Sequence, residues 1–158
     1  MDILAHVSNQ LGKFWIPAIY AERIRTLRTR SYDLPVSEKE NQPVVLHTLL
    51  GVELKVGRSR LTCPDLGTAR YLAVFAAAGC QKVAVPYDIT LIPALADEIE
   101  AAWHRTIDIF ERSTADLAPQ AAGKARARLI RAIRDEIAKI GAGEMMPLFN
   151  TSTRQRDS

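Results

Sequence analysis

The sequence has little of what metal-dependent or nucleotide-dependent catalysis usually requires. It contains three histidines and two cysteines, and none of them has the mutual spacing of a zinc site. It also lacks a Walker A loop, a GxGxxG turn and a GxSxG elbow. These absences exclude the common zinc motifs, the glycine-rich phosphate loops and the nucleophile elbow of the α/β-hydrolases.

Long apolar runs are absent as well. No stretch approaches the roughly 20 apolar residues that span a bilayer, and the N-terminal MDILAHVSNQ carries an acid in place of a basic region. We therefore expect no membrane partner, no signal peptide and a cytoplasmic protein. In that compartment the only cysteines, Cys63 and Cys80, are expected to be reduced thiols.

What is present is a strand–helix–strand pattern at the centre of the chain. Residues 52–56 alternate apolar and charged side chains, which is typical of a half-buried strand. Residues 62–65, TCPD, indicate a helix start with Thr62 as the candidate cap. A largely apolar helix is expected over residues 66–78 and ends at Gly79, and residues 82–85 predict a second strand. A crossover of this length predicts a right-handed βαβ unit with both strands parallel in one sheet.

Further segments complete the predicted α/β fold. Residues 44–49 are expected to form a hairpin with the first strand, so that the sheet is small and mixed. N-terminal helices precede it, and a C-terminal antiparallel helical hairpin, at about residues 91–141, covers one side of it. The expected helices are residues 2–12, 17–30, 92–113 and 121–140. We predict a single domain over residues 1–150, with a flexible C-terminal tail at 151–158.

Charge is segregated along the chain, although the net charge is only +3. The first helix of the predicted helical hairpin is acidic and the second is basic. The two helices are therefore expected to complement each other along their length, with each exposed pair contributing about 0–1 kcal/mol.

The residues with a catalytic pattern are Glu53 and Lys55. They lie two apart on a predicted strand, so both point to the same face. A carboxylate there can ligate Mg²⁺, and a lysine can steady an attacking water or a phosphate oxygen. This E-x-K strand with the helix and strand that follow, over about residues 44–90, resembles the core of the PD-(D/E)xK nuclease superfamily. The resemblance implies a Mg²⁺-dependent nuclease in which Glu53 binds the metal and Lys55 is catalytic.

The metal site of that family also uses an acid from the preceding strand, and residues 44–49 contain none. Asp33 is therefore the expected second metal ligand. Glu38 and Glu40, in the same predicted loop (residues 31–43), are alternatives.

A nuclease of this kind would contact the phosphate backbone of nucleic acid. The expected contacts are Arg58 and Arg60, which follow the E-x-K strand, and Arg70 in the central helix. Arg70 also fits a side chain that simply emerges into solvent from a mostly buried helix.

Two other interpretations stay open. A thiol at a helix N-terminus beside two arginines makes Cys63 a candidate nucleophile, although free cysteines are more often small buried side chains. Alternatively, the protein is a non-catalytic interaction module that binds a second copy of itself or another protein through its C-terminal helices. That interface would use Trp103, Phe110 and the apolar segment 145–149.

Overall fold

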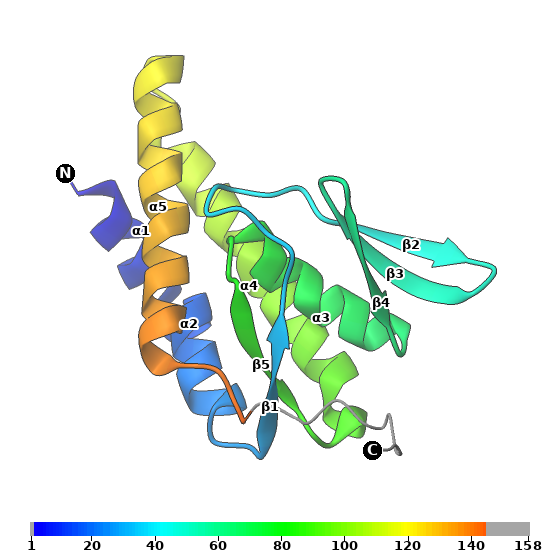
Figure 1. Cartoon of the computed structure of the whole chain (residues 1–158). Coiled ribbons are helices and arrows are strands. Elements are labelled where there is room, and N and C mark those ends of the chain that lie inside the picture. The colour runs from blue at the N-terminus through cyan, green and yellow to red at the C-terminus, as the bar shows by residue number, and fades with distance from the viewer. Residues whose placement is uncertain (1, 145–158) are drawn as a thin grey trace.

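The computed structural model describes residues 2–144 and has a small α/β fold (Figure 1). Segments 145–149 and 151–158 lie outside the described residues. The helices are α1 (Ile3–Leu11), α2 (Ile16–Ile19), α3 (Leu66–Ala77), α4 (Ile92–Ser113) and α5 (Pro119–Ile140). The strands are β1 (Thr29–Asp33), β2 (Val44–Thr48), β3 (Gly51–Val56), β4 (Ser59–Cys63) and β5 (Lys82–Pro86). Short helical turns are η1 (Gly12–Phe14), η2 (Tyr20–Ile24, one π-helical turn) and η3 (Ile89–Leu91).

The start of each long helix follows from its local sequence. Asp65 caps α3, because its Oδ1 accepts a hydrogen bond from the backbone N–H of Thr68 at 2.7 Å. Thr62, which we also considered as a cap, belongs to β4 instead. α4 and α5 both have a proline in the first turn, where the missing N–H costs nothing. The predicted bounds of these two helices are therefore confirmed to within two residues.

A three-stranded antiparallel sheet, in the order β2-β3-β4, packs against α3. The hairpin of β2 and β3 was predicted, whereas β4 was not. The register places Val45, Leu54 and Leu61 side by side on the face toward α3. Glu53 and Lys55 consequently lie on the opposite, outer face of the sheet.

The predicted parallel pairing of β3 with β5 is wrong. β5 pairs with β1 in a separate antiparallel sheet of two strands, with Ser31 opposite Ala84. The physical reason is that β2 and β4 already occupy both edges of β3 through local hairpins, so β3 has no edge left for β5. β1 itself covers residues that we had assigned to the end of a helix and to a loop.

Two buried tyrosines form hydrogen bonds with the backbone of β5 on the side where no described strand pairs with it. Tyr20 accepts a hydrogen bond from the N–H of Ala84 at 2.9 Å, and Tyr71 donates one to the C=O of Ala84 at 2.6 Å. Tyr20 also donates to the carbonyl of Gly141 at 2.8 Å. Burial raises the pKa of both phenols, so both hydroxyls keep the protons that these bonds require.

α4 and α5 run in opposite directions, as a helical hairpin requires (Figure 1). Each packs mainly on other elements, however: α4 on α3 and α1, and α5 on α1, α2 and η2. Trp15 fastens α5 to the N-terminal helices by donating from Nε1 to Oε1 of Glu136 at 3.0 Å. None of the helices within residues 2–144 is long and apolar enough to cross a membrane.

The expected charge pairing between α4 and α5 does not occur, since no salt bridge within residues 2–144 joins them. Acids of α4 pair instead with Arg23 and Arg70, from η2 and α3. On α5, Arg126 holds Glu40 of the 34–43 loop in two hydrogen bonds of 2.7 Å. η2, α3 and this loop therefore provide partners that we had expected the two helices to provide for each other.

We predict that Gly79→Ala destabilises the protein by about 1–3 kcal/mol. Gly79 has a φ of +78°, and a Cβ there would lie 2.9 Å from the carbonyl oxygen of Lys39. Gly123→Ala is the matched control, because it lies within α5 with nothing within 4 Å of an added Cβ. It should stabilise by about 0.5–1 kcal/mol. Chemical denaturation of both variants measures the difference, and a neutral Gly79→Ala would contradict the close approach of the loop.

Candidate functional site

The outer face of the three-stranded sheet carries the residues of the E-x-K pattern. Glu53 and Lys55 share this face, as predicted, and Arg60 joins them from β4 as the direct neighbour of Lys55. An Arg60 guanidinium nitrogen lies 3.2 Å from Oε1 of Glu53. Glu53 is the only acid on the three strands, and this ion pair matches it with a cation.

The expected second metal ligand lies on the other sheet. Asp33 ends β1, and its Oδ1 is 2.9 Å from Nζ of Lys82 on β5. Of the alternatives, Glu40 is held by Arg126, and the backbone carbonyl of Glu38 accepts a hydrogen bond from Arg134. Glu53 and Asp33 thus lie on different sheets, each beside its own cation. No group of three or more His, Cys, Asp or Glu side chains in the described part of the chain could hold a metal ion. This arrangement does not fit the Mg²⁺ site that the resemblance implies.

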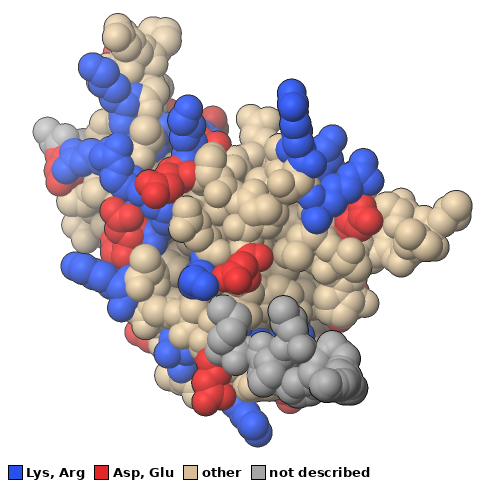
Figure 2. All heavy atoms as spheres, in the orientation of Figure 1, with Lys and Arg blue, Asp and Glu red and all other residues tan. Residues whose placement is uncertain are grey.

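Three cations gather around the β3–β4 turn. Lys55, Arg58 and Arg60 are all exposed, and Arg58 is in the turn itself, next to Gly57 with its φ of +60°. Figure 2 shows this basic group at the upper right, with one acidic residue beside it and the uncharged tip of the β2–β3 hairpin projecting past it. Within residues 2–144, Lys55 and Arg58 take part in no salt bridge. We call Lys55, Arg58 and Arg60 the sheet cations.

Arg70 is engaged within the protein. Its guanidinium lies 2.6 Å from Oε1 of Glu100 and 2.5 Å from Oδ1 of Asp97, both on α4. The hydrogen bonds to Glu100, and then those to Asp97, raise the pKa of Arg70 further above its already high value. Arg70 therefore joins α3 to α4, which matches the expectation of a side chain emerging from a buried helix better than that of a free phosphate contact.

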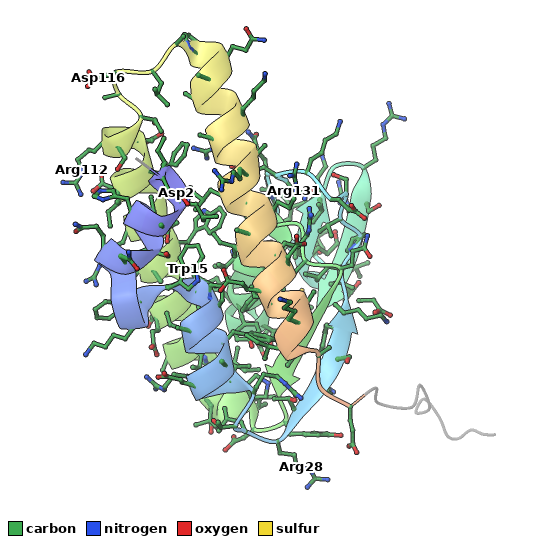
Figure 3. The ribbon with its side chains drawn as sticks, turned by 90° about the vertical axis from the view of Figure 1, so that its left-hand side faces the viewer. Asp2, Trp15, Arg28, Arg112, Asp116 and Arg131 are labelled. Carbon is green, nitrogen blue, oxygen red and sulfur yellow. The ribbon has the colours of Figure 1, made fainter. Side chains whose placement is uncertain are left out.

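A second set of cations lies along α5. Lys124, Arg131 and Lys139 are exposed and form no salt bridge with any other described residue. Basic side chains line α5 on the left of Figure 2, on the same face of the molecule as the sheet cations. In the side view of Figure 3, Arg131 lies to the right of α5, whereas Arg112 of α4 lies at the opposite, left edge. We had expected these basic residues of α5 to pair with the acids of α4. They are free to contact another molecule because long-range packing separates the two helices.

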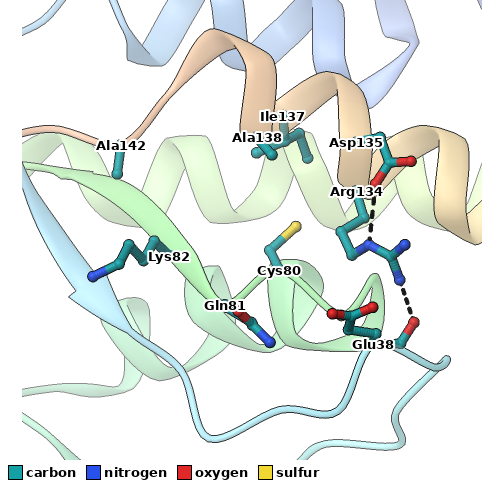
Figure 4. A pocket seen from close by; sticks show the side chains of 10 residues that line it. Glu38, Cys80, Gln81, Lys82, Arg134, Asp135, Ile137, Ala138 and Ala142 are labelled. Atoms are coloured by element: carbon teal, nitrogen blue, oxygen red, sulfur yellow. Dashed lines mark hydrogen bonds and ion pairs between the residues drawn. The ribbon is translucent and has the colours of Figure 1, made fainter.

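A cavity of about 340 Å³ lies between α5, residue 38 and the beginning of β5 (Figure 4). Cys80 lines it, with its sulfur pointing toward α5 in Figure 4. Burial raises the pKa of this thiol to about 12, although Arg134 acts in the opposite direction. Of the charged groups in the wall, Arg134 contacts Asp135 and the Glu38 carbonyl, and Lys82 pairs with Asp33. The thiol that the cavity presents is neutral.

Cys63 is also buried. Burial and then the nearby charge of Asp65 raise the pKa of its thiol. This environment disfavours the thiolate that a nucleophile would need. The two cysteines therefore act as small core side chains.

The two residues of the alternative protein interface that the structure describes are buried or partly buried. Phe110 is 3% exposed, and Trp103 is partly buried against the core. α4 and α5 contribute none of the exposed large apolar side chains of the described residues.

No protein-family model, curated protein or solved structure matches this chain. Function is therefore inferred from the residues themselves.

The buried Cys80 thiol predicts a loss of stability at alkaline pH. In the unfolded chain a thiol releases its proton near its ordinary pKa of 9.0, whereas the folded protein retains the proton up to about pH 12. The free energy of unfolding should therefore fall as the pH rises above 9, with this thiol contributing a slope that approaches about 1.4 kcal/mol per pH unit.

Denaturation of the wild type and of Cys80→Ala between pH 7 and pH 10 measures this contribution. The variant starts from a lower stability because it loses packing, but its stability should decline less steeply. Equal slopes would show that the Cys80 thiol ionises alike in the folded and unfolded chains.

Proposed function

We propose that this protein binds nucleic acid through the face shared by the sheet cations and α5, and that it binds without cleaving. The observation that carries the proposal is the outer face of the three-stranded sheet. It presents three exposed cations, Lys55, Arg58 and Arg60, against a single carboxylate, Glu53, which is already paired. Such a surface attracts a polyanion, because each neutralised phosphate releases counterions to the solvent.

The cations of α5 extend this surface. Basic side chains along α5 and the sheet cations are visible on the same face of the molecule (Figure 2), and Figure 3 labels Arg131 among those of α5. Lys124, Arg131 and Lys139 remain available because no described acid pairs with them. Two separated cationic groups on one face suit an extended chain of phosphates better than a single small anion.

Binding without cleavage follows from the placement of the acids. The resemblance to the PD-(D/E)xK superfamily implies hydrolysis, and such hydrolysis needs a metal held by converging carboxylates. Here Glu53 has Arg60 beside it, and Asp33 lies on another sheet beside Lys82. In this proposal β3, which carries Glu53 and Lys55, is part of a cationic binding surface and not of a metal site.

We predict that the double variant Lys55→Ala/Arg58→Ala lowers the affinity for nucleic acid about tenfold or more at low salt. The plot of the logarithm of the binding constant against that of the salt concentration should become shallower by about 2, since two phosphate contacts are lost. Fluorescence anisotropy with labelled single-stranded and double-stranded DNA and RNA, at several salt concentrations, measures both quantities. These substitutions leave the Glu53–Arg60 pair intact.

The matched control is Arg105→Ala/Arg112→Ala. It removes the same charge from exposed residues of α4, and Figure 3 places Arg112 on the side away from the proposed surface. It should change the affinity by less than about threefold, because it removes no phosphate contact. Equal losses in the two double variants would show that only net charge matters, and undetectable binding by the wild type at low salt would overturn the proposal.

We also predict that bound DNA and RNA stay intact in the presence of Mg²⁺ or Mn²⁺, and that binding persists in EDTA. Gel analysis of the nucleic acid after incubation tests this directly. Strand breaks that require the metal and disappear in Glu53→Gln would instead extend the superfamily resemblance to its activity.

A further inference from the structure

Within the described residues, the three-stranded sheet is open at both of its edges, β2 and β4. β2 pairs with β3 on one side, and no described strand pairs with its other side. Proteins normally protect such an edge with a charged side chain, a proline or a bulge. β2 and the turn after it, residues 44–50, read VVLHTLL and contain none of these.

This edge is also where apolar side chains are most exposed. Leu49 and Leu50 form the tip of the hairpin at 107% and 94% exposure, and Val44 at the start of β2 is 49% exposed. The hairpin projects from the body of the molecule at the right of Figures 1 and 2. Exposed apolar groups along an unpaired strand indicate a surface that another chain covers.

The distribution of charge favours a second copy of this chain at this edge. The opposite edge of the sheet, β4, carries Arg60 and follows Arg58, so two copies joined there would bring arginines together. β2 has no charged residue, whereas the sheet cations lie on β3, on β4 and in the turn between these two strands. An antiparallel pair of β2 strands therefore joins two neutral edges and keeps the cations apart.

We propose that two copies of the protein pair through β2 to form a continuous six-stranded antiparallel sheet, with the two-fold axis at Leu46. In this register Val44 lies opposite the Thr48 of the second copy, which joins two β-branched side chains. Each hairpin tip then lies beside the residues that lead into β2 of the other copy. The paired area is small, so the dimer should exchange with the monomer.

The pairing enlarges the proposed nucleic-acid surface, and this part of the inference rests on the proposed function. A two-fold axis that pairs antiparallel strands in one sheet is perpendicular to the sheet, so both outer faces point the same way. The two β3 strands are three strand spacings apart, or about 14 Å. The sheet cations of both copies then face one extended polyanion, and the linked contacts raise the affinity beyond that of one copy.

The oligomeric state tests the pairing without nucleic acid. In sedimentation experiments the wild type should shift toward twice the 17.5 kDa of the chain as its concentration rises. Leu46→Lys should remain a monomer, because the two introduced lysines would face each other at the axis. Within each copy that lysine lies opposite Glu53, so the hairpin retains a favourable cross-strand pair. A wild type that stays monomeric up to about 0.1 mM, or equal dimerisation of both proteins, would overturn the pairing.

Cross-linking tests the register. Residues that face each other in a non-hydrogen-bonded antiparallel pair have Cα atoms about 4.5 Å apart, within the range of a disulfide. Leu46→Cys should form a disulfide dimer under mild oxidation, whereas Thr48→Cys should not, since the two introduced thiols would lie about 13 Å apart along the strands. The native Cys63 and Cys80 are buried and give a low background. Equal cross-linking of both variants would exclude this register.

The two proposals fail separately. Dimerisation that disappears in Leu46→Lys, together with no binding to nucleic acid, would support the β2 pairing and overturn the proposed function. Binding to nucleic acid by a protein that remains monomeric would support the function and overturn the pairing.

Discussion

The bonding of the Ala84 backbone is the constraint on which the rest of the fold depends. β5 is a buried strand with one neighbouring strand among the described residues, and an unbonded peptide group inside a protein costs about 1–3 kcal/mol. Tyr20 and Tyr71 remove that cost by bonding the N–H and the C=O of one residue. Because Tyr20 also bonds Gly141, a single hydroxyl joins the N-terminal turn, β5 and the end of α5. The two-stranded sheet therefore needs no pairing between β5 and β3.

Sequence patterns predicted the elements that are long or locally paired. The existence of α4, the burial of α3 on most of its sides and the β2–β3 hairpin all follow from the spacing of apolar residues over short stretches of sequence. β4 was missed although Leu61 and Cys63 alternate with Arg60 and Thr62, because the flanking Pro64-Asp65 indicated a helix start. β1 was missed because its pairing with β5 crosses about fifty residues and leaves little local signal. Topology was thus the part that local spacing could not supply.

The candidate surface likewise contains residues whose positions the sequence predicted and residues whose partners it did not. The shared face of Glu53 and Lys55 follows from strand alternation alone, and Arg58 and Arg60 follow from their place at its end. The partners of Asp33 and Arg70 could not be predicted, because Lys82 and Glu100 approach them only after the chain has folded. The acids and bases along the sequence suggested pairing between α4 and α5. Their actual partners come from α3, η2 and the 34–43 loop.

The bonds that fasten α5 also set the order in which the chain can fold during synthesis. Trp15–Glu136 and Tyr20–Gly141 each join residues 121 positions apart, and the hydroxyl of Ser31 on β1 bonds the carbonyl of Gly143. When β5 has just emerged from the ribosome, residues 136–143 have not, so none of these three hydrogen bonds can form. The hairpins of the three-stranded sheet can form at that stage, because their contacts are local. The N-terminal helices α1 and α2 pack on α4 and α5, so they must wait for almost the whole chain. The surface proposed to meet nucleic acid can therefore form before the body that supports it.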